Sequence, residues 1–200
     1  MIKRQPTEQR QKQIAMAALK IISVHGLRKF TTAAIAKEVG ISDGTIFRHF
    51  ANKSEIVTAA LAMAEAILFE NFPPESDEPL ERLRLFFEQR AQIAISHPYI
   101  MHLIQTEQLV YAVSEPALVS FRKWKRRSIV FIEECLREAQ DRDEIGQNIP
   151  VESLVIVVYG TLMGLLMTHS GTSPSPKTST KKLWQTLELL LRRSWTGPCQ

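Results

Sequence analysis

Residues 31–50 read TTAAIAKEVGISDGTIFRHF, and they predict two short helices joined by a tight turn. Gly40 stands where the chain must turn, a position that favours the positive φ that glycine adopts at little steric cost. Ser42 precedes the second helix as an N-cap, which would leave free backbone N–H groups for an anion. The two helices would be held together by the apolar side chains of Ile35, Ala36, Val39, Ile41, Ile46 and Phe50.

The rest of the chain carries helical periodicity, and no sustained two-residue alternation indicates a strand. Gly26 is expected to end a first helix, and the segments 71–77 and 171–176 have the composition of loops. We therefore expect an all-α fold. The expected helices span residues 7–25, 32–39, 43–49, 53–70, 80–97, 98–111, 117–142, 151–169 and 178–193.

Charge is distributed unevenly along the sequence. Residues 1–56 carry ten Lys and Arg against four Asp and Glu, whereas the remaining residues carry 15 basic and 17 acidic side chains. A basic first quarter joined to a nearly neutral body indicates a part that binds a polyanion. We expect a polyanion-binding domain at 1–56 and a second domain at 57–200.

The segment around the predicted turn resembles the tetracycline-repressor (TetR) family of bacterial regulators over roughly residues 7–60. Beyond residue 60, only the helix count and the total length are similar. The resemblance implies a nine-helix, two-domain architecture, a homodimer, a palindromic operator and, usually, release from DNA by a small ligand. The matching elements are Thr31-Thr32, Ile35-Ala36, Gly40-Ile41-Ser42, the run 44–50 and the run 52–55.

The chemistry of these side chains, together with the resemblance, predicts two groups of DNA contacts. Hydroxyl, imidazole and ammonium groups can bind phosphate oxygens, and they belong to Thr31, Ser42, Thr45, His49 and Lys53. Base edges are expected to meet Asp43, Gly44 and Arg48, because Arg can bind guanine, Asp can accept from cytosine, and Gly permits close approach.

Three further features surround these contacts. Phe47 departs from the family's more usual Tyr, so it would pack against a DNA sugar or against the domain core. Asn52, followed by an acid at Glu55, predicts the cap of a fourth helix. The basic pair Lys3-Arg4 would either add contacts to DNA or fray in solvent.

The last two predicted helices are the expected dimer interface. Small side chains share one face of the first of them, at Val157, Gly160, Thr161 and Gly164. The other offers an apolar stripe of Trp184, Leu187 and Leu191. These residues would form a four-helix arrangement between two subunits, and the alternative is that they belong to the core of one subunit.

A ligand pocket is expected among the fifth to eighth helices, where apolar walls and a few polar groups occur together. The apolar bias of its lining favours a hydrophobic or amphipathic effector. The candidate lining residues are Phe86, Arg90, His102, Gln105, Tyr111, Trp124, Tyr159 and Met163.

Several other classes of function are disfavoured. No nucleophile–base motif or Gly-rich phosphate loop occurs, so we expect neither an enzyme nor a cofactor. The segment 141–152 has calcium-loop spacing, but Ile145 stands where an oxygen ligand is needed, and we expect no metal. The apolar run 154–167 is short for a membrane span, and the two cysteines are far apart, which favours a cytoplasmic protein.

The expected function is a DNA-binding transcriptional regulator, a repressor rather than an activator. Its effector would favour a conformation in which the distance between the two DNA-binding domains does not match the operator. One alternative is a DNA-organising protein of the same fold, controlled by a protein partner. The other is a helical enzyme or carrier whose helix-turn-helix is incidental.

Overall fold

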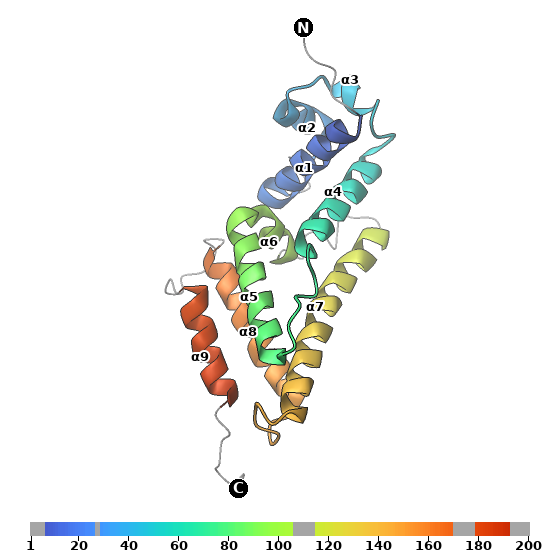
Figure 1. Ribbon diagram of the computed structural model, residues 1–200. Helices are drawn as coiled ribbons and strands as arrows, with labels where there is room; N and C mark the ends of the chain where they lie inside the picture. Colours follow the sequence, from blue (N-terminus) through green and yellow to red (C-terminus); the bar gives the residue numbers. More distant parts are fainter. Residues whose placement is uncertain (1–6, 27–28, 106–114, 170–178, 193–200) are drawn as a thin grey trace. The chain divides into compact units, whose positions relative to one another are not determined.

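The computed structural model describes residues 7–26, 29–105, 115–169 and 179–192, and all regular structure within them is α-helical. This confirms the all-α prediction, and Figure 1 shows the order of the helices. They are α1 (Thr7–His25), α2 (Thr32–Val39), α3 (Asp43–Ile46), α4 (Lys53–Leu68), α5 (Pro79–Ser96), α6 (Pro98–Gln105), α7 (Glu115–Asp141), α8 (Val151–His169) and α9 (Thr180–Arg192).

The first of two compact units comprises residues 1–70 and 97–123. In it α1 packs against α2, α4 and α6, and α2 contacts α3. The apolar stripe of α1 is buried, with Ile14 and Ala18 fully inaccessible to solvent. Ile35 of α2, Ile46 of α3 and Ile56 of α4 are equally buried, so one small core fixes the four N-terminal helices.

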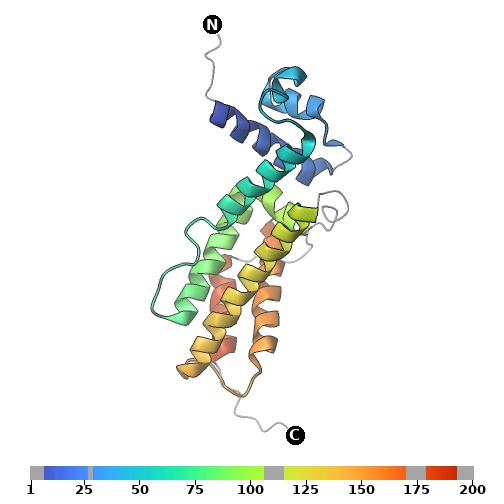
Figure 2. The ribbon, with the colours of Figure 1, turned by 90° about the vertical axis from the view of Figure 1, so that its right-hand side faces the viewer.

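The second unit comprises residues 71–96 and 124–200. Helix α5 contacts both α8 and α9, and Figures 1 and 2 show α5, the last part of α7, α8 and α9 running alongside one another. The core of this unit is built from large apolar side chains that face inward at helical spacing. Fully buried members include Leu83, Phe86, Phe87, Ile132, Leu136 and Val158.

Helix α3 is shorter than the predicted 43–49. It ends at Ile46, and residues 47–49 form a turn. The N–H groups of Arg48 and His49 donate to carbonyls three residues back, at 3.2 and 2.9 Å, which is the tighter geometry common at helix ends. This tightening leads the chain to Phe50, whose ring is buried in the core.

The other predicted helices have ends within a few residues of those observed. Gly26 has the expected positive φ, at 69°, and its N–H donates to the carbonyl of Ile22 at the end of α1. Helix α6 reaches Gln105, and the remainder of its predicted range, 106–111, lies outside the described residues. The division into functional domains at 1–56 and 57–200 stays a prediction.

Candidate DNA-binding surface and effector site

Thr31 caps the N-terminus of α2. Its φ and ψ are −123° and 152°, and its Oγ1 accepts a hydrogen bond from the N–H of Ala34 at 3.0 Å. This bond occupies one lone pair of the hydroxyl and leaves its proton free to donate. Thr31 is exposed, so that proton is available to a phosphate oxygen.

Gly40 makes the turn between α2 and α3, as expected from its type. It has φ 74° and ψ 38°, in the left-handed region that favours glycine. The N–H of Ile41 donates to the Ala36 carbonyl at 2.9 Å, and that of Gly40 to the Lys37 carbonyl at 3.3 Å. This pair of bonds is a Schellman motif, which fixes the direction in which α3 leaves α2.

Ser42 stands at the N-cap position of α3, but its side chain does not bond to the helix backbone. Its hydroxyl instead pairs with that of Thr45, at 2.7 Å between Oγ and Oγ1. The capping bond implied by the sequence is therefore absent. In the hydroxyl pair one proton is shared and the other is left to donate outward.

Four side-chain positions on and beside α3 face solvent: Asp43, Gly44, Phe47 and Arg48. Nothing lies within 4 Å of where a Cβ on Gly44 would stand. Phe47 is 53% exposed, which rules out the alternative that its ring packs in the domain core. A large exposed aromatic side chain beside an exposed arginine is suited to contact with a sugar or base face.

His49 and Lys53 follow these residues in the sequence, in the turn after α3 and at the start of α4. His49 is half-buried, and because its Nδ1 is buried, Nε2 is the ring nitrogen suited to an outside acceptor. Its carbonyl accepts from Gln11 Nε2 at 3.0 Å, a contact between α1 and the α3 turn that sequence reasoning missed. Lys53 is exposed in the first turn of α4.

The predicted Asn52 cap of α4 is present. Asn52 Oδ1 accepts from the N–H of Glu55 at 2.9 Å, and Glu55 Oε2 accepts from the N–H of Ala51 at 2.9 Å. The Glu55 carboxylate thus reaches the residue before the cap, and the two bonds together fix the start of α4 and the position of the Lys53 backbone. The basic pair Lys3-Arg4 lies outside the described residues.

The candidate effector residues are distributed over both units. Phe86, Arg90, Trp124, Tyr159 and Met163 belong to the second unit. His102 and Gln105 lie on α6 in the first unit with their side chains outside the described part, as is the whole of Tyr111. The structure therefore describes only five of the eight side chains.

Two of those five side chains, Phe86 and Arg90, stack on each other. Phe72 and Arg127, which the sequence did not single out, join this contact. The guanidinium carbon of Arg90 lies 4.8 Å from the ring centroid of Phe86 and 5.8 Å from that of Phe72. Arg127 covers the same Phe72 ring at 4.8 Å. The basic run 122–127 on α7 was a usable signal for Arg127, whereas Phe72 stands in a loop with no periodic pattern.

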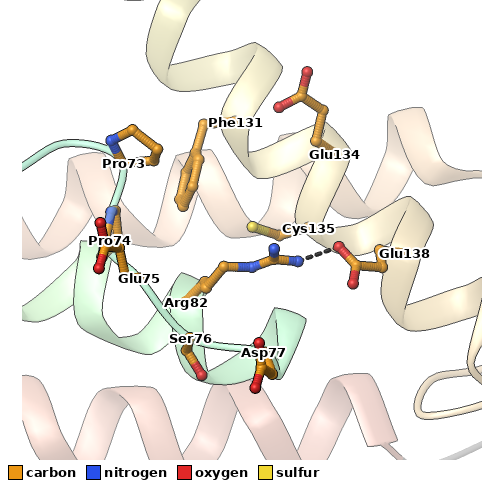
Figure 3. A pocket seen from close by; sticks show the side chains of 10 residues that line it. All are labelled: Pro73, Pro74, Glu75, Ser76, Asp77, Arg82, Phe131, Glu134, Cys135 and Glu138. Carbon is orange, nitrogen blue, oxygen red and sulfur yellow. Dashed lines mark hydrogen bonds and ion pairs between the residues drawn. The ribbon is translucent and has the colours of Figure 1, made fainter.

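A hollow of about 610 Å³ opens in the second unit between the segment 73–77, α5 and α7 (Figure 3). Its lining includes the acidic residues Glu75, Asp77, Glu134 and Glu138 and the basic residue Arg82, which pairs with Glu138. Burial raises the pKa of the Cys135 thiol to about 11, so it is protonated and unreactive at neutral pH. None of the eight predicted effector residues lines this hollow.

Within the described part of the chain, no group of three or more His, Cys, Asp or Glu side chains could hold a metal ion. The segment after α7 is a turn in which Gln140 Nε2 donates to the carbonyls of Gly146 and Ile149, both at 2.9 Å. In the same residues, the window Val151–Thr168 of α8 is long and apolar enough to cross a membrane by length and composition alone. Core helices of soluble proteins meet the same criterion, so this is weak evidence.

The α9 stripe proposed from sequence for the dimer interface is buried within the chain. Trp184, Leu187 and Leu191 are at most 5% exposed, and the Trp184 ring lies 5.4 Å from that of Phe87 on α5. These three residues therefore belong to the core of one subunit, which is the alternative to a dimer interface that the sequence left open. On α8, Val157 is 50% exposed, and Gly160 and Gly164 have open space beside them.

Comparison with known proteins connects this geometry to a family. A family model described as bacterial regulatory proteins, tetR family, matches residues 14–60, which contain α2, the Gly40 turn and α3. The nucleoid occlusion factor SlmA of Vibrio campbellii (strain ATCC BAA-1116) is 23% identical over 165 residues, which cover 80% of this chain and 83% of that protein.

Two further proteins are similar over most of the chain. The HTH-type transcriptional regulator UidR of Escherichia coli (strain K12) is 26% identical over 165 residues, covering 79% of this chain and 81% of its own. The solved structure of AibR in complex with isovaleryl coenzyme A and operator DNA superposes with a TM-score of 0.70 at 15% identity, covering 93% of this chain and 100% of that one. The family match over residues 14–60 and these similarities together support a TetR-family DNA-binding transcriptional regulator.

Proposed function

We propose that this regulator is a homodimeric repressor that binds a palindromic operator and is released from it by a small hydrophobic or amphipathic effector. One observation carries the DNA-binding part of the proposal. A rigid Schellman turn at Gly40 presents Asp43, Gly44, Phe47 and Arg48 to solvent on one short helix and the turn after it.

The proposed DNA contacts divide into positioning and reading. Thr31, Ser42, Thr45, His49 and Lys53 would hold phosphates, because their hydroxyl, imidazole and ammonium groups can donate to phosphate oxygens. Asp43, Gly44 and Arg48 would face base edges in the major groove. Phe47, exposed beside Arg48, would pack on a sugar.

The proposed dimer interface is an exposed apolar stripe on α8. Ile156 is 73% exposed, Val157 50% and Met167 43%, and Gly160 and Gly164 lie between them at helical spacing. The absence of Cβ atoms at the two glycines allows a second helix to approach closely. Leu189 and Leu190 of α9, 61% and 63% exposed, add apolar surface in the same unit.

Effector control is supported by the similarity to AibR, whose structure was solved with isovaleryl coenzyme A and operator DNA. An effector can weaken operator binding only through its differential affinity for two conformations. We propose the second unit as its site and the cytoplasm as the place of action. We propose no catalytic activity.

Selection of binding sites from a random pool of duplex DNA with the full chain tests this function. We expect enrichment of a symmetric sequence with half-sites one helical turn or a multiple apart, because a two-fold symmetric dimer places its two α3 helices on one face of the duplex. Enrichment of a single asymmetric site would contradict the dimer. No enrichment above the starting pool would contradict sequence reading itself.

A second candidate function is a DNA-organising protein controlled by a protein partner. The similarity to SlmA, a nucleoid occlusion factor, favours it. The two candidates differ in their response to small molecules. A repressor releases its selected site when an effector binds, whereas a partner-controlled organiser keeps that site until the partner is added.

A further inference from the structure

The hollow of Figure 3 is formed entirely within the second unit. The segment 73–77 lies on one side of it, and α5 and α7 supply the remaining lining. Its volume of about 610 Å³ lies within the range of about 300–1,000 Å³ that is usual for small-molecule sites. The hollow is therefore large enough for an organic ligand.

Part of the lining of the hollow is apolar. Pro73 and Pro74 lie on the segment before α5, and Phe131 lies on α7. The ring centroid of Phe131 is 5.0 Å from that of Phe72 and 5.2 Å from that of Phe86, so packing fixes the surface that Phe131 contributes. A hydrocarbon chain in the hollow can pack on this surface and on the two prolines.

The polar part of the lining is acidic. Glu138 is neutralised within the chain, because it pairs with both Arg82 and Arg142. Three other lining carboxylates have no ion pair within the described residues, and all three are exposed: Glu75, Asp77 and Glu134. The hollow therefore carries negative charge that its own lining does not balance, and this charge attracts a cation.

These three carboxylates are spread over the hollow. In Figure 3, Glu134 of α7 and Asp77 of the segment before α5 lie on opposite sides of Phe131 and Cys135. In the part of the chain that the structure describes, no three His, Cys, Asp or Glu side chains are placed to hold one metal ion. Separated negative charges with an apolar surface between them suit a ligand whose positive charges are also separated.

We propose that this hollow binds an organic dication, in which two ammonium groups are joined by a hydrocarbon chain, and that this ligand is the effector. The ammonium groups would pair with carboxylates on the two sides of the hollow, and the hydrocarbon chain would pack on Phe131 and the prolines. The inference rests on the proposed function, because it names the chemical class of the effector. It places the effector on residues other than the eight candidates named from the sequence.

Three probes with the same hydrocarbon chain test the proposal: octane-1,8-diamine with two charges, octan-1-amine with one, and the uncharged octan-1-ol. Their binding to the full chain is measured by isothermal titration calorimetry at low salt. We expect each ammonium group to strengthen binding about fivefold, the upper range for an ion pair that stays in contact with water. The preference for the diamine should disappear at about 1 M salt, because exposed ion pairs are screened.

Matched variants locate the charges that bind the diamine. Glu75→Gln, Asp77→Asn and Glu134→Gln together should remove the preference, so that the diamine binds no more tightly than octan-1-ol. All three positions are exposed, so the triple variant should keep its helix content, which circular dichroism measures. Glu152→Gln is the control, because residue 152 is an exposed acid of α8 that does not line the hollow, and it should retain the full preference.

Three results would overturn the inference: no binding of the diamine, equal binding of the diamine and octan-1-ol, or the same preference in the triple variant and the control. Failure of the proposed function has a different signature, because operator release is measured separately by fluorescence anisotropy. If the diamine binds through the three carboxylates but leaves the selected operator complex intact, the effector-released repressor is wrong and the cation-binding site stands.

Discussion

At the scale of single residues, the surface of α3 is defined as much by a missing side chain as by those present. Asp43 and Arg48 are exposed, and between them Gly44 has open space where a Cβ would stand. A groove wall can therefore approach the helix backbone at this point. A longer side chain at residue 44 would have room in the free protein but would meet DNA in the complex.

Gly44→Gln tests this geometry. Because a Cβ at residue 44 would have nothing within 4 Å in the free protein, we expect the free energy of unfolding to change by about 1 kcal/mol or less. Affinity for the selected operator should fall about tenfold or more, a loss comparable to that of a mismatched base pair. Urea unfolding and fluorescence anisotropy measure the two quantities.

Ala66→Gln is the matched control, because residue 66 is an exposed position near the C-terminal end of α4. It should leave both stability and DNA affinity unchanged. Unaltered DNA binding by the residue 44 variant would show that α3 does not approach the groove through Gly44.

At the scale of the elements, sequence patterns predicted which helices form but not always which face is buried. The Gly40 turn and the Asn52–Glu55 cap are local, and both have the hydrogen bonds expected from their residue types. The end of α3 depends on how Phe50 reaches the core, so its length could not be read from residues 43–49 alone. Likewise, the apolar stripe of α9 is equally compatible with a partner subunit or with α5.

The exposed stripe of α8 gives a prediction at this scale. Ile156→Glu should weaken the homodimer about a hundredfold or more, because a carboxylate would be buried without a partner in the interface. The fold of each subunit should be retained, since Ile156 is 73% exposed within the chain. Sedimentation equilibrium gives the dissociation constant, and circular dichroism gives the helix content.

Val130→Glu provides the comparison for that experiment. Val130 is a partly exposed apolar residue of α7, outside the proposed interface, so the same change in charge there should leave the dimer intact. A dimer unaffected by the residue 156 substitution would place the interface elsewhere.

At the scale of the whole molecule, the sequence predicted the class of protein better than it predicted the effector. The basic first quarter and the fixed spacing of residues 31–55 are continuous in the chain, so both could be recognised without the fold. The hollow of Figure 3 joins α5, α7 and the segment 73–77, which come together only through packing. None of the predicted effector residues that the structure describes lines it, so Glu75, Phe131 and Glu134 required the structure.

The most direct test of the central claim is fluorescence anisotropy of the full chain on its selected operator and on scrambled DNA, across a salt series. A dimer with several phosphate contacts should give a log–log salt slope of roughly −5 to −7. The operator should be preferred by about a thousandfold or more. Arg48→Ala should cost about 1–3 kcal/mol of this preference while barely changing the salt slope. Equal affinity for the two DNAs, or no binding to either at low salt, would contradict a regulator that reads sequence through α3 and the turn that follows it.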